Sequence, residues 1–495
     1  MSNDNHPIKQ FHGQENTEQT HGRKIIEQTH GRKIIEQTRG RKIIEQTRGR
    51  ENPERSHGWE NIAPSFSALA LHAGYDPAEH HHSSGVPLYQ TAAYALPSEE
   101  YASRIVFSEL DDDIYSRISN PTTGILEKRL AALHGVSGAV ATSSGLAALG
   151  DAILNIAAGG GRILTSYRLY GGTVAAFSNV LPDYGISFDF AHNPDDPRSW
   201  EERIRPDTKA LLVESVSNPL NAVADLGTLA GIAHTHGIAL IVDNTLATPY
   251  LLNPFDFGAD IVVYSTTKSI NGHGNAIGGI VLESGAFDYA SGRYPQFSRK
   301  AWTLRTRDGR ERSILDVAPN TPFTARLRSF IVTLLGSSPS PFNSYLTLLG
   351  LETLSARLDK ETRTARKVAE FLDGDPRVAK VFHPAAHDYA YRDLASKYLK
   401  HDGSTLITFD LDTEERKRDV LDALRLFQLQ ANIGDSKSLA VDPLLVTHSE
   451  LTPDELYAAG IHHEAIRLSI GLEEPDDLIA DLAQALDHAY GIANN

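Results

Sequence analysis

The chain has 495 residues, with 47 Lys and Arg against 63 Asp and Glu, which gives a formal net charge of −16 at pH 7. This length exceeds what one hydrophobic core supports and predicts two or three packed units. The negative charge repels phosphate backbones and anionic lipid, so neither nucleic acid nor a membrane is expected as a partner. The sequence contains no Cys, which excludes disulfides, thiolate nucleophiles and Cys-ligated metals.

The first residues, MSNDNHPIKQFHGQ, lack the apolar stretch and small-residue cleavage site of a secretory signal, and no apolar run is long enough for a transmembrane helix. We therefore expect a cytoplasmic protein. From Glu18 to Arg50 a nine-residue unit repeats as EQTHGRKII twice, EQTRGRKII and EQTRGR. A period of nine builds no continuous apolar face on a helix or a strand, so residues 1–57 are predicted to be a disordered tail. A basic tether for an acidic partner is the alternative.

Alternating helices and strands are predicted from about Thr122. The segment LGTLAGIAHTHG has a helical apolar face and ends at Gly237, before the apolar run IALIV. Two more short apolar runs, Ala210–Glu214 (ALLVE) and Asp260–Tyr264 (DIVVY), have the length of buried parallel strands. Residues 122–336 are therefore predicted to form an α/β domain with a mostly parallel, doubly wound sheet, whose ligand site lies at the carboxyl ends of the strands.

The pattern changes after the turn-rich string SSPSP. A single long helix is expected over NSYLTLLGLETLSARLDKETRTARKVAEFL, followed by short strands and a last amphipathic helix. Residues 337–495 are thus predicted to form a smaller C-terminal α+β domain.

Polar residues end three of the predicted strands: Glu214, Asp243, and Tyr264 followed by STTK. A Lys just after a buried strand is partly desolvated, which lowers its pKa and frees the amine to form a Schiff base. Lys268 is in this position and is suited to hold pyridoxal 5'-phosphate (PLP). Asp243 is the candidate anion for the pyridinium nitrogen of that cofactor. Taken singly, an Asp or Lys at a strand end is more often structural or solvated than catalytic, since structural ion pairs perturb pKa values too.

A phosphate site is predicted at SSGLAALGDAILNIA. The segment becomes helical after Ser144, where backbone N–H groups are free to bind an anion. Ser265 and Thr267 could add hydroxyl donors. An ordinary helix N-cap at Ser144 is the alternative.

Seven motifs occur in the order YSRISNPTT, SSGLAAL, LYGGT, ESVSNP, DNTLATP, STTKSINGHG and IRLSIGLE. Through them the chain resembles, from about Ser67 to Ala489, the cystathionine γ-synthase-like family of PLP enzymes of cysteine and methionine metabolism. The resemblance implies a PLP-dependent transferase of fold type I. It also implies individual roles: Lys268 as Schiff-base lysine and proton shuttle, Asp243 on the pyridinium, Tyr170 stacked on the ring, Asn218 on the ring hydroxyl, Thr245 against the ring, and Ser144, Gly145, Leu146, Ser265 and Thr267 around the phosphate.

The same resemblance implies a partner subunit. Tyr115 and Arg117 of YSRIS are similar to residues that family members insert into the neighbouring subunit's site. Residues 58–121 are then an N-terminal arm, and the enzyme is expected to be a homodimer at least and a homotetramer by analogy with the family. Arg467 of IRLSIG matches the arginine that binds the substrate carboxylate, for which a planar fork is well suited.

Finer similarity points to the members that act on O-acetylhomoserine with sulfide. It is carried by LYGGT, SPFNSYLTLLGLETL and ANIGDSKSLAVDP, and by an insertion resembling residues 285–335. Ser438 is then expected to help hold the substrate carboxylate. The expected reaction is γ-replacement on O-acetyl-L-homoserine by sulfide or a thiol, giving homocysteine or methionine and acetate. Cystathionine γ-synthase or γ-lyase activity is the alternative. The chain departs from these members at Leu444–Val446, where bulkier residues could reshape the entrance.

Other classes fit less well. The glycine-rich string GHGNAIGG lacks the GxGxxG spacing of a dinucleotide site and precedes a strand instead of opening a helix. His80, His81 and His82 are consecutive and point in divergent directions, so no metal site is predicted. A catalytically inactive scaffold is disfavoured because Lys268, Asp243 and Arg467 are all present.

Overall fold

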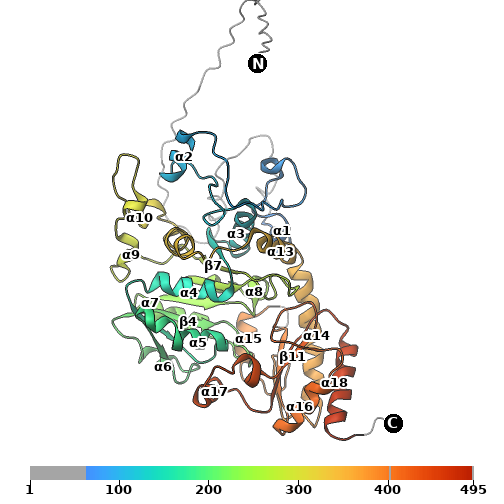
Figure 1. Ribbon diagram of the computed structural model, residues 1–495. Coiled ribbons are helices and arrows are strands. Elements are labelled where there is room, and N and C mark those ends of the chain that lie inside the picture. The colour runs from blue at the N-terminus through green and yellow to red at the C-terminus, as the bar shows by residue number, and fades with distance from the viewer. Residues whose placement is uncertain (1–62, 401–402, 493–495) are drawn as a thin grey trace, which may run out of the picture. The chain divides into compact units, whose positions relative to one another are not determined.

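A computed structural model describes residues 63–400 and 403–492 (Figure 1). The nine-residue repeats and the tail predicted for residues 1–57 lie outside this range. Within the described residues, no helix has both the length and the apolar character needed to cross a membrane.

A seven-stranded sheet forms the centre of the large domain. Its strands are β1 (Gly138–Thr142), β2 (Gly161–Thr165), β3 (Ile186–Phe190), β4 (Thr208–Glu214), β5 (Ala239–Asp243), β6 (Ile261–Ser265) and β7 (Gly279–Glu283), in the spatial order β1-β7-β6-β5-β4-β2-β3. The strands from β3 to β6 run parallel, and β7 is antiparallel to both of its neighbours. The predicted mostly parallel sheet is confirmed.

Helices cover both faces of this sheet. Along β4 the side chains alternate, with Leu211 in one hydrophobic cluster and Leu212 in the other. Helix α7 (Leu226–Thr235) adds Leu229 and Ile232 to the first cluster, and α4 (Gly145–Ile156) adds Ile153 to the second. A strand buried on both sides loses its alternating pattern, which explains the continuous apolar runs in the sequence.

The C-terminal part carries a second sheet of five strands in the order β10-β11-β12-β9-β8. These strands are β8 (Lys380–Phe382), β9 (Leu406–Asp410), β10 (Gln428–Leu429), β11 (Leu439–Val441) and β12 (Ala465–Ser469). Helices α14 (Leu354–Gly374) and α16 (Glu414–Ala423) pack on it, and α18 (Pro475–Ala489) packs on both of these helices. The predicted C-terminal α+β arrangement is confirmed.

The single long helix expected after SSPSP is wrong. The segment forms two helices, α13 (Pro341–Glu352) and α14, separated at Thr353, whose φ of −105° and ψ of 4° leave the helical region. Helix α13 packs on α3 (Pro121–His134), where Ser344 and Thr123 share a hydrogen bond of 2.9 Å between their hydroxyls. Helix α14, unlike α13, packs on the second sheet and on α18, so we propose the domain boundary near Thr353 in place of residue 337.

The remaining helices lie in the N-terminal arm, in the insertion between β7 and α13, and in connections. They are α1 (Phe66–His72), η2 (Pro77–His80), α2 (Glu99–Val106), α5 (Gly171–Asn179), η3 (Leu181–Tyr184), α6 (Pro197–Glu201), α8 (Thr248–Leu251), η4 (Pro254–Phe257), α9 (Pro295–Ser298), η5 (Trp302–Leu304), α10 (Ile314–Val317), α11 (Pro322–Arg326), η6 (Leu327–Val332), α12 (Thr333–Leu335), α15 (Arg392–Tyr398), η7 (Pro443–Thr447) and α17 (Pro453–Ala459).

Candidate active site

The carboxyl ends of β4, β5 and β6 meet at one edge of the large sheet. Glu214 and Asp243 are register partners on β4 and β5. A chain of hydrogen bonds continues from there: Thr245 N–H donates to Asp243 Oδ1 (2.9 Å), and Ser265 N–H donates to Thr245 Oγ1 (2.9 Å). The N–H of Lys268 then donates to the Ser265 carbonyl (3.2 Å). The sheet therefore brings the predicted lysine and carboxylate to one edge.

The two carboxyl groups share this edge without a cation. Glu214 accepts hydrogen bonds from the N–H groups of Tyr170 (2.6 Å) and Asn218 (3.1 Å). Burial raises the pKa of Asp243, and burial together with Asp243 raises the pKa of Glu214 well above its usual range. Among residues 63–400 and 403–492, no Lys or Arg pairs with either carboxyl. A positively charged ring nitrogen placed against Asp243 would supply the missing countercharge.

The amine of Lys268 is prepared to react. Its Nζ donates to Asn432 Oδ1 at 2.7 Å. Burial, and after it the charge of Arg467, lowers the pKa of the amine to about 8. A neutral amine is the nucleophile in Schiff-base formation, so this environment favours covalent attachment of an aldehyde.

Arg467 is fully buried on β12 and faces the same site. One terminal nitrogen donates to Asn218 Oδ1 (3.0 Å) and the other to the Asn432 carbonyl (3.1 Å). Its Nε has no hydrogen-bond partner among the described residues, and burial lowers the pKa of the guanidinium to about 10. A buried cation with an unused donor is a receptor for a small anion such as a carboxylate.

An anion cradle lies at the start of α4. Ser144 caps the helix by accepting from Ala147 N–H (3.1 Å), while the N–H groups of Gly145 and Leu146 have no acceptor within the helix. A Cβ atom at Gly145 would overlap Ser265, so the glycine allows the Ser265 side chain to lie against the helix end. Thr267 Oγ1 donates to the carbonyl of Gly278 (3.2 Å) and accepts from its N–H (3.0 Å), which fixes that hydroxyl beside the lysine.

Comparisons with known proteins decide the family. The family model for Cys/Met metabolism PLP-dependent enzymes matches residues 67–487. The chain belongs to this family. It is 38% identical to a homocysteine synthase of Schizosaccharomyces pombe over 86% of this chain and 98% of that protein.

Two solved structures are similar to this member of the Cys/Met family. A putative O-acetylhomoserine (thiol)-lyase of Campylobacter jejuni, with a pyridoxyl-lysine monophosphate, matches with a TM-score of 0.81 and 39% identity over 86% of this chain and all of that one. A cystathionine γ-synthase of Xanthomonas oryzae in complex with cystathionine matches with a TM-score of 0.75 and 30% identity over 87% of this chain and all of that one. The expected PLP dependence and fold type I are confirmed.

The site fits the PLP that this family uses. In such a complex Lys268 would bind the aldehyde, Asp243 the ring nitrogen, and the start of α4 the phosphate. Tyr170 is 42% exposed at the start of α5 and is free to cover a ring. A Cβ atom at Gly172 would lie 2.7 Å from the Tyr170 ring, so any larger residue there would displace the tyrosine.

Tyr115 and Arg117, which were predicted to complete a partner subunit's site, do not join the group around Lys268 of their own chain. Tyr115, on the N-terminal arm, is 41% exposed, and the guanidinium of Arg117 stacks on its ring at 5.3 Å. Arg117 also donates to the Thr333 carbonyl (2.5 Å), in the insertion before α13. Within one subunit's described residues, neither side chain bonds to the group around Lys268.

The substrate-carboxylate role of Ser438 stays a prediction, and in the structure its side chain has partners within the protein. Its buried hydroxyl donates to Glu473 (2.7 Å) and accepts from Gly471 N–H (2.9 Å). It also lies three positions along the chain from Val441, the register partner of Arg467, or roughly 10 Å in a strand. Asn432 touches both Lys268 and Arg467, and we propose it as a second contact for the substrate carboxylate.

Sequence reasoning missed Asn432 and His448. The motif ANIGDSKSL contains both Asn432 and Ser438, and its sequence alone does not indicate which of the two side chains faces Lys268. His448 is buried after η7, its Nδ1 bonded to Thr447 Oγ1 (3.0 Å), and burial lowers its pKa to about 4, so the imidazole is neutral. Its Cα lies 2.9 Å from where a Cβ of Gly171 would be, which places this segment directly against the Tyr170 turn.

Asn432→Ala is expected to weaken binding of the amino-acid substrate, whereas Ser438→Ala is expected to lower the stability of the folded protein. Loss of the Asn432 amide should raise KM for the amino-acid substrate by about tenfold, the effect of removing one hydrogen bond to a charged group. Ser438→Ala should leave KM unchanged and lower stability by about 1–3 kcal/mol, because Glu473 loses a buried partner. Steady-state kinetics and denaturant unfolding measure the two effects. A raised KM in Ser438→Ala alone would return the carboxylate role to Ser438.

Proposed function

We propose that this enzyme catalyses γ-replacement on O-acetyl-L-homoserine, with sulfide or a thiol as the incoming group and acetate as the leaving group. Sulfide would give homocysteine, and methanethiol would give methionine. The observation that carries the proposal is the Lys268 amine, held by Asn432 beside the buried Arg467 and linked through Thr245 to Asp243. The similar proteins named above, a homocysteine synthase and an O-acetylhomoserine (thiol)-lyase, support this choice of substrate.

Each group has a separate task in this reaction. Arg467 binds the substrate carboxylate and so fixes the α-carbon near Lys268. Lys268, with a pKa of about 8, moves protons at the α- and β-carbons because both its neutral and charged forms are accessible near neutral pH. PLP supplies an electron sink for the carbanion. Asp243 keeps the ring nitrogen protonated, and Tyr170 covers the ring and keeps water away from it.

Leu445 and Val446 are 60% and 47% exposed on η7, and they border a hollow together with Leu421 of α16 and Leu429 of β10. They therefore give no preference between sulfide and cysteine as the incoming group. Cystathionine formation from cysteine stays the alternative, supported by the similar cystathionine γ-synthase.

The wild type and Lys268→Ala should be assayed first with O-acetylhomoserine and sulfide, then with O-succinylhomoserine and cysteine. The wild type is expected to use the first pair at least about tenfold better in kcat/KM, which corresponds to roughly 1.4 kcal/mol of transition-state discrimination. Lys268→Ala should have no measurable turnover with either pair, because it loses both the cofactor bond and the proton shuttle. A preference for the second pair, or turnover without any incoming thiol, would contradict the proposed reaction.

We also propose a homodimer in which Tyr115 and Arg117 complete the partner's site, with tetramers as a further step, in the cytoplasm. Large apolar side chains support a subunit contact. Leu334 and Leu335 are each 65% exposed beside the Arg117 contact, and Ile277 is 59% exposed where its carbonyl accepts from Asn343 on α13. Exposed apolar side chains beside the segment that holds Arg117 fit such a contact.

Co-expression of Tyr115→Ala with Lys268→Ala tests the shared site. Each variant alone should be inactive, whereas random mixing should restore about one quarter of wild-type activity, since half of the dimers carry one intact site of two. Tyr170→Ala with Lys268→Ala is the matched control. Tyr170 binds Glu214 of its own chain, so that pair should restore nothing. Equal, negligible activity in both mixtures would show that Tyr115 serves its own subunit.

A further inference from the structure

The turn that follows Lys268 is packed tightly from two sides. On one side, α13 lies so close that a Cβ atom at Gly350 would overlap the Asn271 carbonyl. On the other, a Cβ at Gly434 would overlap Ser269, and Ser436 N–H donates to the Gly272 carbonyl (2.9 Å). The position of the lysine thus depends on two segments that lie far beyond it in the chain, the end of α13 and the segment around Gly434 and Ser436.

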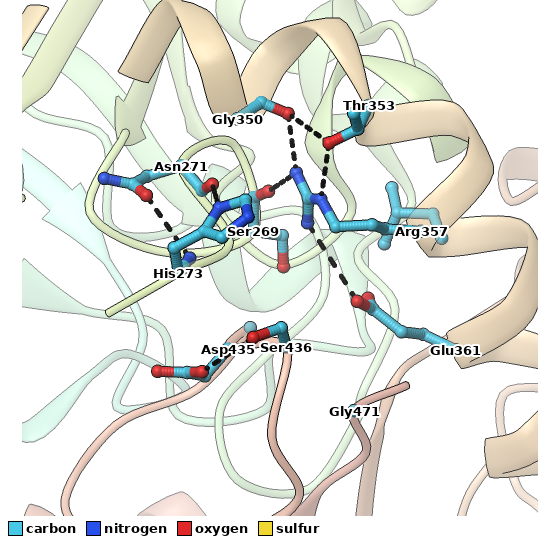
Figure 2. Close-up of polar contacts among 12 residues, drawn as sticks. Ser269, Asn271, His273, Gly350, Thr353, Arg357, Glu361, Asp435, Ser436 and Gly471 are labelled. Carbon is cyan, nitrogen blue, oxygen red and sulfur yellow. Dashed lines mark hydrogen bonds and ion pairs between the residues drawn. The ribbon is translucent and has the colours of Figure 1, made fainter. Parts of the chain in front are cut away.

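Arg357 on α14 joins this turn to the end of α13 (Figure 2). One terminal nitrogen donates to the carbonyls of Ser269 (2.8 Å) and Gly350 (2.9 Å), and Nε donates to Thr353 Oγ1 (3.1 Å). A Cβ atom at Gly272, where φ is +71°, would overlap the other terminal nitrogen. The buried guanidinium therefore fills the space beneath the turn and binds the residue next to Lys268.

Glu361 lies one helical turn beyond Arg357, and its carboxyl points toward the guanidinium in Figure 2. The closest approach, from Arg357 Nη1 to Glu361 Oε1, is 4.0 Å. Both carboxyl oxygens and Nη1 are buried without hydrogen-bond partners among the described residues. Asp435 and Glu473 are the other charged groups that face Glu361, so within residues 63–400 and 403–492 Arg357 is its countercharge.

We propose that Arg357 is a positioning residue for Lys268 and that the charge of Glu361 holds its guanidinium in place. Arg357 and Glu361 lie on α14 and not at the carboxyl edge of the large sheet. The pair acts on the lysine through the Ser269 carbonyl. Because the guanidinium is planar and branched, it binds Ser269 and Gly350 through one nitrogen and Thr353 through another, a spacing that the single nitrogen of a lysine does not reproduce. The inference rests on the proposed function only in assigning Lys268 as the cofactor lysine.

Because the charge of Glu361 changes with pH, the strength of its attraction for Arg357 should change with pH too. Burial raises the pKa of this carboxyl to about 7, partly offset by Arg357 and reinforced by Asp435 and Glu473. The carboxyl is mostly neutral near pH 6 and mostly charged near pH 8, so the charge that holds Arg357 is present only at the higher pH. Glu361→Gln has nearly the same shape and stays neutral at both.

The decisive experiment follows PLP release from the purified holoenzyme of the wild type and of Glu361→Gln, without substrate. The ratio of the variant's rate to the wild-type rate is expected to be about 1 near pH 6 and to rise several-fold near pH 8, since Glu361, with a pKa of about 7, gains its charge between them. Taking the ratio cancels any pH dependence common to both proteins. A ratio that is the same at the two pH values overturns the role of Glu361.

Arg357→Met and Arg357→Lys test the positioning role itself. Arg357→Met should lower kcat by at least about tenfold, as expected when a reacting group is misplaced, with little change in KM because Arg467 is untouched. Arg357→Lys should recover part of the loss. If Arg357→Met does not fold, the Lys variant is compared with the wild type in the same assays.

Arg129→Met is the matched control. Arg129 is also a buried arginine that donates to a carbonyl, that of Ala73 (3.0 Å), and to a carboxylate, that of Glu352 (3.2 Å). Its replacement should lower the melting temperature and leave kcat and PLP release unchanged. If the Arg357 variants likewise lose only thermal stability, the positioning role is overturned. PLP release is read without substrate, so an error in the proposed reaction would not affect it.

Discussion

The parallel register of β4, β5 and β6 is the constraint on which the site depends. It sets Glu214 beside Asp243 and, through Thr245 and Ser265, leads to Lys268. A shift of one residue in this register would move every side chain of a strand to the opposite face of the sheet. Because helices pack on both faces, such a shift is strongly disfavoured. The hydrophobic core thus fixes the positions of polar groups that contribute little to its own stability.

Charges of opposite sign are kept apart in the site. Two carboxyls lie at the sheet edge without a cation, while Lys268 and Arg467, with pKa values lowered to about 8 and about 10, lie near each other. Burying unpaired charges is costly. A ligand with a cationic ring and an anionic carboxylate offsets both costs, so the unbound site already specifies the charge pattern of what it binds.

Much of this could be predicted from the sequence, because strands buried on both faces and polar residues at their ends leave local patterns. Lys268 and Asp243 were found in that way, and the family motifs supplied Arg467 and Tyr170. The rest depends on contacts between distant segments. Asn432 reaches Lys268 across 164 positions, and Arg357 reaches Ser269 across 88. The helix break at Thr353 likewise reflects different packing partners for α13 and α14, which hydrophobic periodicity does not reveal.

The pKa of the Lys268 amine is measured most directly by the rate at which cofactor-free protein captures PLP as pH is raised. Only the neutral amine reacts, so the rate should rise with a midpoint near pH 8, where burial and Arg467 place the pKa. Arg467→Met should move this midpoint upward, because it removes a neighbouring positive charge. A wild-type midpoint near 10.5, the ordinary value for lysine, would show that the sheet edge does not prepare the amine for catalysis.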